Sequence, residues 1–425
     1  MKLTVFQSGP GDCVLVESQD GTLMLVDGGL AKSYREHVAP ALSTLREAGR
    51  ELDVVCVSHV DGDHIGGILA LLDAEFDWRV HAFQSADPTR RTRRPSEPRP
   101  PNVKELWHNG FRAQLDADPR PVAELLSQTA GVLELSEDAQ RLEDAAHQRD
   151  LAYSAGDGIR LSDRISEHQL DIPLNRRFGG EGGLLMVREA RQTADVGTLE
   201  VTLLAPFEVD VVNFQADWHE WIGKHEAEMG RIREDTRKDL ERLNLDDVGT
   251  FRDALAQSAG RLGDRGEVTA PNLASIMLLV REQDDKTLLL TGDGHGDDLL
   301  KGLEHAGEIT AGGALHVNVL KVPHHGAEYN VDTDQRLYER ITADHYVICA
   351  NGSHHNPDLR IVDLLIKSRL AADPRPFKLW INSNPQVTGN KHMEDVRRRV
   401  NQRLDEHPGR FEATFLEGSS FDLDP

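Results

Sequence analysis

Residues 58–67 read SHVDGDHIGG and follow the apolar run DVVCV, a pattern that predicts a buried strand ending in a tight turn. A strand that ends in a turn can aim several side chains at one point. Imidazole and carboxylate together form a ligand set that holds a divalent cation. Four such side chains fall within the six positions 59–64, namely His59, Asp61, Asp63 and His64. The segment therefore predicts a metal site at the end of this strand.

The glycines of the same segment support this interpretation. Gly62 lets the loop fold back, and Gly66 with Gly67 allows a helix to pack closely straight after the last His. The alternative is a solvated acidic loop with a capping Asp, because Asp and His are common in turns. Four candidate ligands at one strand end favour the metal site.

The composition excludes some classes of function. With 72 acidic and 48 basic residues the formal net charge is −24, which argues against wrapping duplex nucleic acid over a broad surface. Any contact with nucleic acid must be local or mediated by metal. The three cysteines, Cys13, Cys56 and Cys349, are widely spaced in apolar runs and are expected to be buried thiols in a reducing compartment. No apolar signal core and no run of about 18 apolar residues occurs, so we expect a soluble, cytoplasmic protein without membrane contact.

Strand and helix patterns alternate along most of the chain. An opening antiparallel sheet is expected at 2–7, 13–17 and 22–26, then a helix at 35–49, the strand 53–58 and a helix at about 65–72. Further strands are expected at 156–161, 199–204, 275–280, 287–290, 317–322, 345–349 and in the tail after Phe411. Two charged stretches, 119–150 and 212–262, are predicted to be helical insertions.

Several other predicted strands end in residues that can bind metal or transfer protons. These residues are Asp27, Asp293, the pair His324–His325 and the pair His354–His355. Strand ends that all present Asp or His converge on one edge of the architecture. A pair of metal ions about 3.5–4 Å apart needs roughly this supply of ligands. A cap or turn role is the alternative for each, and it is weaker for the two His-His pairs.

The order of these motifs resembles the metallo-β-lactamase fold, and specifically the variant found as the nuclease-like domain of the competence protein ComEC. The matching segments, in chain order, are GPGDCVLVES (9–18), LVDGG (25–29), SHVDGDHIGG (58–67), APNLASIMLLV (270–280), LLLTGD (288–293) and VLKVPHHG (319–326). That variant has His-x-Asp-x-Asp-His where the superfamily has His-x-His-x-Asp-His, and residues 59–64 show the variant. The resemblance implies an α/β protein with the four-layer αββα sandwich and helical insertions. It implies one elaborated domain over 1–425, with an insertion at 85–182 that carries the Arg/Pro-rich loop and a helical insertion at 208–265.

The resemblance also assigns roles. It implies one metal on His59 and Asp61, a second on Asp63 and His64, and Asp293 as the bridge between them. Asp27 would orient a ligand from behind, and Asp63, His324 and His325 would act in catalysis, the two His as ligands or as proton donors to the leaving group.

Two features depart from the family pattern. The family places a His before Pro in the last turn, whereas this chain has Asn356 before Pro357, so either His354 or His355 takes that role as a ligand or the role is absent. No counterpart of the superfamily's third-motif His is evident between residues 65 and 292.

The implied activity is that of a metal-dependent hydrolase with two divalent ions, Mn²⁺ or Zn²⁺, and a metal-activated hydroxide, most simply a phosphodiesterase or nuclease. The carboxylate of Asp61 adds hard oxygen and shifts the preference from zinc toward manganese. A centre this anionic tolerates a pair of divalent ions even without a neighbouring Lys or Arg. DNA or RNA is the expected substrate. The Arg-rich loop at 90–99 either binds backbone phosphates or is a plain solvated loop. Alternatives are a hydrolase of a small ester, lactone or thioester, or a degenerate metal-binding scaffold whose helical insertions bind protein partners.

Overall fold

A computed structural model of the chain describes residues 1–87, 89, 92–109, 157–158, 160–178, 183–208, 275–283, 285–331 and 336–425. The two predicted helical insertions, 119–150 and 212–262, therefore lie wholly outside the described residues.

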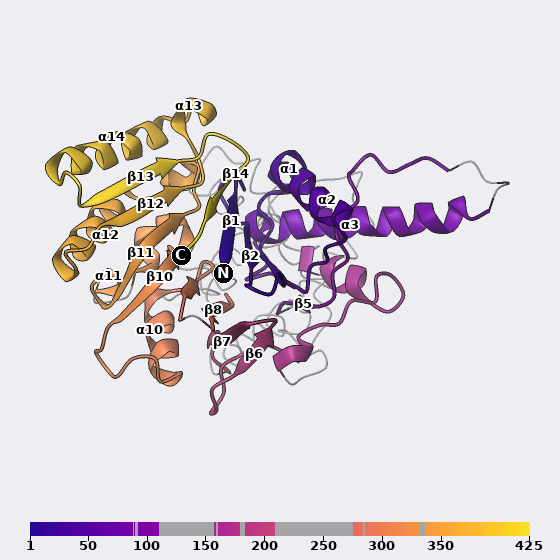
Figure 1. Cartoon of the computed structure of the whole chain (residues 1–425), viewed down its shortest axis with the longest axis horizontal. Coiled ribbons are helices and arrows are strands. Elements are labelled where there is room, and N and C mark those ends of the chain that lie inside the picture. Colours follow the sequence, from indigo (N-terminus) through magenta and orange to yellow (C-terminus); the bar gives the residue numbers. More distant parts are fainter. Residues whose placement is uncertain are drawn as a thin grey trace, which may run out of the picture.

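Two mixed β-sheets form the centre of the described structure (Figure 1). The first sheet has the order β14-β1-β2-β3-β4-β5, and its first hairpins are antiparallel as the sequence predicts. Strands β4 and β5 join it in parallel to β3. The strands are β1 (Lys2–Phe6), β2 (Val14–Glu17), β3 (Leu23–Val26), β4 (Val54–Cys56), β5 (Leu106–Trp107) and β14 (Ser420–Leu423).

The second sheet has the order β13-β12-β11-β10-β9-β8-β7-β6. Its half from β9 to β13 is parallel, and its other half is antiparallel. The strands are β6 (Thr193–Val196), β7 (Leu199–Ala205), β8 (Met277–Glu282), β9 (Thr287–Leu290), β10 (Leu315–Lys321), β11 (Ile341–Ile348), β12 (Phe377–Ile381) and β13 (Phe411–Phe415).

Alternating burial along the strands shows how the layers are arranged. In β3, Met24 and Val26 face the second sheet, while Leu23 and Leu25 pack on the helices outside the first sheet. In the same way Val347 of β11 belongs to the core between the sheets, and its neighbours in sequence pack on the outer helices of the second sheet. A strand with two buried faces needs a layer on each side. The result is the expected four-layer αββα sandwich.

Helices cover both outer faces (Figure 1). The first sheet carries α1 (Ala31–Ser33), a π-helical turn (Tyr34–Val38), α2 (Ala39–Glu47) and α3 (Gly62–Ser85). The second carries α10 (Gly296–His305), α11 (Leu337–Arg340), α12 (Leu359–Ala372), α13 (Pro385–Thr388) and α14 (Lys391–Glu406). Short 3-10 turns are Arg176–Phe178, Pro323–Gly326, Glu328–Asn330 and Ser353–His355. None of the helices in the described part of the chain combines the length and apolarity that crossing a bilayer requires.

Three sequence predictions differ from the structure. The segment 156–161 is helical at its described positions and not a strand, because Leu161 and Ile165, four residues apart, bury one helical face against the first sheet's outer core. Within the range 85–182 expected as an insertion, Leu106–Trp107 is a strand of the first sheet. Helix α3 extends to Ser85, well beyond the predicted end near Leu72, and its last third leaves the globular body (Figure 1).

A close approach of two backbones fixes the start of α3. A Cβ on Gly67 would lie 1.9 Å from the carbonyl oxygen of Gly28, so only glycine fits there. Gly67 N donates to Gly29 O at 2.8 Å, and Gly28 N donates to His64 O at 2.9 Å. This contact holds the turn after β3 against the first turn of α3, and so brings Asp27 beside His64.

Candidate metal centre

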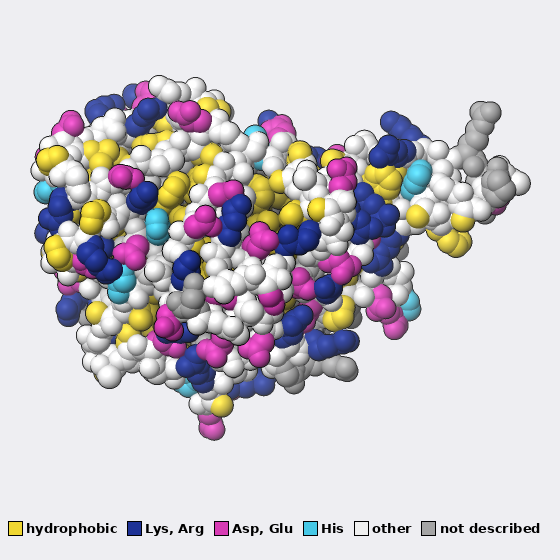
Figure 2. Space-filling model, viewed as in Figure 1, with side chains coloured by type: hydrophobic (Ala, Val, Ile, Leu, Met, Phe, Trp, Pro, Cys, Tyr) yellow, Lys and Arg dark blue, Asp and Glu magenta, His cyan; other side chains and the backbone are white. Residues whose placement is uncertain are grey.

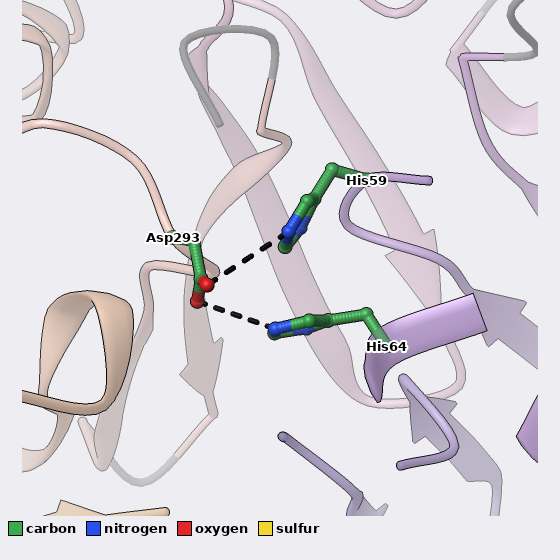
Figure 3. Close-up of side chains that lie close together, drawn as sticks. All are labelled: His59, His64 and Asp293. Atoms are coloured by element: carbon green, nitrogen blue, oxygen red, sulfur yellow. Dashed lines mark ion pairs between the residues drawn. The ribbon is translucent and has the colours of Figure 1, made fainter. Parts of the chain in front are cut away.

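The ends of three strands deliver the candidate ligands to one place. His59 follows β4, and Asp63 and His64 lie in the first turn of α3. Asp293 follows β9, and the pair His324–His325 follows β10 in the neighbouring parallel position. Figure 3 shows the Asp293 carboxylate facing both imidazoles of the first sheet's side. The centre therefore lies between the two sheets, with ligands from each.

The carboxylate of Asp293 is the common point of contact. His64 Nε2 lies 3.3 Å from its Oδ1, and three further Nε2 atoms lie near its Oδ2: His325 at 3.1 Å, His324 at 3.6 Å and His59 at 3.8 Å. The side chain is 3% exposed. One buried carboxylate thus faces four imidazole nitrogens in the described part of the chain.

Asp27 and Ser58 fix the protons of the two imidazoles from the first sheet. The Asp27 carboxylate accepts from Ser58 N at 2.7 Å, from Ser58 Oγ at 2.8 Å and from His64 Nδ1 at 3.0 Å. Because the Ser58 hydroxyl hydrogen goes to Asp27, Ser58 Oγ accepts from His59 Nδ1 at 3.0 Å. Both imidazoles therefore carry their hydrogen on Nδ1.

The two imidazoles from the second sheet are fixed in the same sense. His325 Nδ1 donates to the carbonyl oxygen of Cys349 at 2.8 Å, and a carbonyl can only accept. Asn330 donates its Nδ2 hydrogen to Asp293 O at 2.8 Å, so its Oδ1 accepts from His324 Nδ1 at 2.5 Å. Every one of the four rings therefore turns an Nε2 lone pair toward the Asp293 carboxylate when it is neutral.

This arrangement fits a metal ion better than it fits the protein alone. His64 Nε2 and His325 Nε2 lie 3.4 Å apart, and two neutral rings with their hydrogens on Nδ1 cannot donate to each other there. His59 Nε2 and Asp293 Oδ1 are buried with no hydrogen-bond partner among the described residues. A divalent cation satisfies all of these atoms at once, since neutral imidazole and carboxylate oxygen are its usual ligands.

The charges of the centre shift its ionisation equilibria strongly. Burial alone would raise the pKa of Asp293, but His325, His64 and His324 hold it well below the usual range. Burial alone would lower the pKa of His325, yet Asp293 and Asp12 raise it to about 10. The carboxylates thus attract positive charge to the imidazole nitrogens, whether as protons or as a metal ion.

Three sets of candidate ligands in the described chain are close enough to hold an ion. The first is His59, His64 and Asp293, the second is Asp63, His64 and His325, and the third is Asp12, Asp27 and His64. Asp61 lies at the edge of the first set, with its Oδ2 3.5 Å from His59 Nε2. The first two sets resemble the two predicted ones, except that His64 belongs to both and His325 enters the second. Asp27 lies behind His64, where the sequence places it.

The structure does not bring His354 and His355 to this centre. Both lie exposed on the turn Ser353–His355, and the described structure shows neither in a set of possible ligands. The ring of His355 packs edge-on against that of His392, with 5.4 Å between centroids. No described His between residues 65 and 292 joins a ligand set either. His108 follows β5 and is buried, and burial lowers its pKa to about 4.

A buried lysine lies beside the centre. Lys321, at the end of β10, forms an ion pair with Asp12 and lies 3.7 Å from Asp293 Oδ1, so the centre does have a neighbouring cation. Sequence reasoning missed both residues. The available signals were the Gly-Asp of GPGDCVLVES and the Lys that precedes PHHG, both polar residues in otherwise apolar strand contexts.

Comparison with known proteins supports the class of protein that this fold and centre indicate. Residues 7–134 match the family model described as Metallo-beta-lactamase superfamily. The matched region includes Asp27 and the segment 58–67, and the described chain has an α/β sandwich of the type found in that superfamily. The chain matches no curated protein significantly. The superfamily and the His/Asp sets together indicate a metal-dependent hydrolase.

Proposed function

We propose that the protein is a ComEC-like phosphodiesterase or nuclease that uses two divalent metal ions on nucleic acid. The convergence of four Nε2 atoms on Asp293 carries this proposal. Asp61 supports it further, because a carboxylate at this position makes the centre richer in hard oxygen than an all-imidazole site, and hard oxygen suits manganese.

The proposal assigns two roles to residues of the chain, metal binding and proton transfer. His59, His64, His325 and Asp293 would hold the ions, with Asp61 and Asp63 completing the two sets. When bound, a metal pair supplies a strong nucleophile at neutral pH and neutralises charge on a phosphoryl group. His324, whose Nδ1 is held by Asn330, is placed to take or give a proton through Nε2 at the edge of the centre.

The exposure of these residues supports a substrate approach from the side of the partly exposed ones. The side chains of Asp61, His324 and Asp63 are 32%, 27% and 24% exposed, whereas those of His59 and His64 are almost fully buried. The buried ligands form the floor of the centre and the partly exposed ones its rim. A substrate therefore meets the rim residues first.

An arm beside the centre supports a polyanionic substrate. We define the arm as the last third of α3 with the described residues 92–99 that return along it. Arg94 lies over the ring of Trp78, at 5.1 Å from its centroid, and Trp78 Nε1 donates to Glu97 O at 2.9 Å. Figure 2 shows Lys and Arg side chains gathered where the arm leaves the body. Although the whole chain is acidic, this surface presents arginine and aromatic groups, which together bind nucleic-acid strands.

The distance along α3 favours a long substrate over a small one. Trp78 is fifteen positions beyond Asp63, which corresponds to about 22 Å along a helix. A small ester cannot touch the metal centre and the arm together, but a nucleic-acid strand can. Phe83, near the end of the arm, is 78% exposed and offers a further surface on which a base can stack.

The direct test is cleavage of labelled single- and double-stranded DNA and RNA by the purified protein with added Mn²⁺ or Zn²⁺. We expect metal-dependent cleavage of at least one of these, and its loss in the Asp63→Ala variant. Asp77→Ala is the matched control, since it removes an exposed carboxylate from the same helix away from the centre. Hydrolysis of small esters without cleavage of any nucleic acid would overturn the proposal.

The arm gives a second, independent test. The double variant Arg93→Ala, Arg94→Ala should weaken cleavage of a strand of about 20 nucleotides, which spans both sites, because strand binding depends on basic groups. It should leave the hydrolysis of a small phosphodiester unchanged. Arg398→Ala on α14 removes an exposed arginine elsewhere and should change neither rate. Equal loss on both substrates would contradict a role of the arm in binding the strand.

A further inference from the structure

The Lys321 ammonium contacts acceptors inside the protein and does not reach the surface. Its Nζ donates to Gly292 O at 2.9 Å, forms an ion pair with Asp12 and lies 3.7 Å from Asp293 Oδ1. Two of the three ammonium hydrogens are donated to Gly292 O and Asp12, and the Asp293 carboxylate lies just beyond hydrogen-bond distance, where it attracts the ammonium by charge. The side chain is 2% exposed, so it cannot reach a substrate.

Asp12 extends this contact behind two of the imidazoles. It lies in the turn between β1 and β2, where a Cβ on the preceding Gly11 would lie 1.7 Å from Asp63 O. Its carboxylate oxygens lie 3.6 Å from His325 Nδ1 and 3.9 Å from His64 Nδ1. The Lys321–Asp12 pair therefore touches the face of the centre opposite to the Nε2 atoms.

The pair also matters for the charge of the centre. Asp12, Asp27, Asp61, Asp63 and Asp293 bring five negative charges if all are ionised, and Lys321 cancels one. The remainder matches the charge of two divalent ions. A fifth uncompensated carboxylate this deeply buried would carry a large desolvation cost.

From this geometry we propose that Lys321 and Asp12 are positioning residues, which hold the Asp293 carboxylate and the His64 and His325 rings in the orientation that binds metal. The positive charge of Lys321, 3.7 Å from Asp293 Oδ1, favours the orientation in which Oδ1 faces the lysine and Oδ2 faces the other imidazoles. The inference rests on the metal centre of the proposed function. It concerns metal affinity and requires no knowledge of the substrate.

The test is the charge-conserving double variant Asp12→Asn, Lys321→Met, titrated calorimetrically with Mn²⁺. Replacing both partners avoids leaving one buried charge unpaired, so the fold should survive. Groups that orient metal ligands typically contribute 10- to 100-fold to metal affinity, and we expect a loss of about this size. A thermal melt in EDTA reports the fold separately.

A control uses an ion pair far from the centre whose cationic partner is buried. Arg369 is fully buried with Asp344 3.7 Å away, and the double variant Asp344→Asn, Arg369→Met removes a similar pair from β11 and α12. It should alter the melt and leave the Mn²⁺ affinity unchanged. Wild-type affinity in the Asp12–Lys321 double variant would overturn the inference, since a merely structural pair changes only the melt.

A second variant keeps the question answerable if the double variant unfolds. Lys321→Arg keeps the positive charge beside Asp12 but replaces the compact ammonium by a planar guanidinium. The guanidinium cannot contact Gly292 O, Asp12 and Asp293 with the same geometry. We expect a several-fold loss of Mn²⁺ affinity in the folded protein, and unchanged affinity refutes the inference. A wild-type protein that binds neither Mn²⁺ nor Zn²⁺ would refute the proposed function itself, which is a different outcome.

Discussion

Asp27→Asn is the substitution that most directly tests the proton arrangement of the centre. The change keeps the shape of the side chain and removes its charge. Asp27 is 1% exposed, so solvent neither screens its contacts nor replaces them. In the native protein it accepts hydrogen bonds from Ser58 N, Ser58 Oγ and His64 Nδ1.

The expected loss follows from these contacts. An Asn side chain keeps one oxygen for Ser58 N and turns its NH₂ group toward Ser58 Oγ and His64 Nδ1. The Ser58 hydroxyl can rotate and accept, so that contact survives. His64 must accept at Nδ1, which moves its hydrogen to Nε2, the atom that faces Asp293. Losing one charge-assisted hydrogen bond destabilises the fold by about 1.5–3 kcal/mol. The misplaced hydrogen should lower metal affinity about 10- to 100-fold, as for other groups that orient metal ligands.

Two measurements separate these effects. Urea unfolding in EDTA gives the stability loss, and calorimetric titration with Mn²⁺ gives the affinity. Asp53→Asn is the matched control, because Asp53 also accepts a backbone hydrogen bond in the first sheet, from Leu23 N at 3.1 Å, but lies at the opposite end of β3. It should lower stability without changing Mn²⁺ affinity. Wild-type affinity in Asp27→Asn would refute the assignment of the His64 hydrogen to Nδ1.

Three further outcomes follow from the same geometry. Asp293→Asn should reduce bound Mn²⁺ to background in elemental analysis, because it removes the negative charge that four imidazole Nε2 atoms face. Retained metal would contradict the assignment of Asp293 as the shared ligand. Gly67→Ala should lower the free energy of unfolding by about 1–3 kcal/mol through overpacking against Gly28 O, whereas Gly62→Ala in the same helix, which meets nothing within 4 Å, should not. The wild-type protein in EDTA should have a free energy of unfolding about 2.7 kcal/mol lower than in free Mn²⁺ at 100 times its Kd. An unchanged urea midpoint would argue against metal binding to the folded state.

Sequence patterns predicted the fold and the positions of the strand ends well, for an identifiable reason. Short apolar runs that end in Gly or Asp mark the points where buried strands leave the core, as at Asp27 and Asp293. In a layered α/β fold such ends meet at one edge, so types of residue and chain order predict which groups meet. The segment 58–67 carried most of this information, since it combines the strand end, the ligands and the glycines of the close approach.

Contacts that depend on three-dimensional position could not be predicted in this way. Lys321 and Asp12 lie more than 300 residues apart in the chain, and neither has a local pattern that distinguishes a buried ion pair from a solvated charge. The His354–His355 pair shows the opposite error. It has the same composition as His324–His325 and also follows a strand, but it lies exposed on its turn. The residue types at a strand end therefore predict candidate metal ligands, and the side chains that neighbouring strands place beside them decide whether they join the centre.

Backbone conformation explains why two adjacent histidines can share one carboxylate. Successive side chains of an extended strand point to opposite faces, so His324 and His325 could not both face Asp293 if β10 simply continued. Both residues instead adopt left-handed backbone angles, with φ of 42° and 56°. Such conformations cost on the order of 1–3 kcal/mol each and persist where surrounding contacts hold them. Here His324 N donates to Gly292 O at 3.1 Å and His325 Nδ1 to Cys349 O, which tie the turn to the ends of the two neighbouring strands.

The pair His354–His355 has the same left-handed angles, with φ of 53° and 61°, yet the described structure places no carboxylate of the centre against it. Left-handed backbone alone therefore does not create a pair of ligands. At His324–His325 the turn also receives a carboxylate from β9 and a lysine from the end of its own strand, and these fix where the imidazoles converge. Three features thus act together to position the imidazoles, namely the left-handed backbone of the turn, the Asp293 carboxylate and the Lys321–Asp12 pair. They come from β1, β9 and β10, so a metal bound there would tie the two sheets together as well as serve the chemistry.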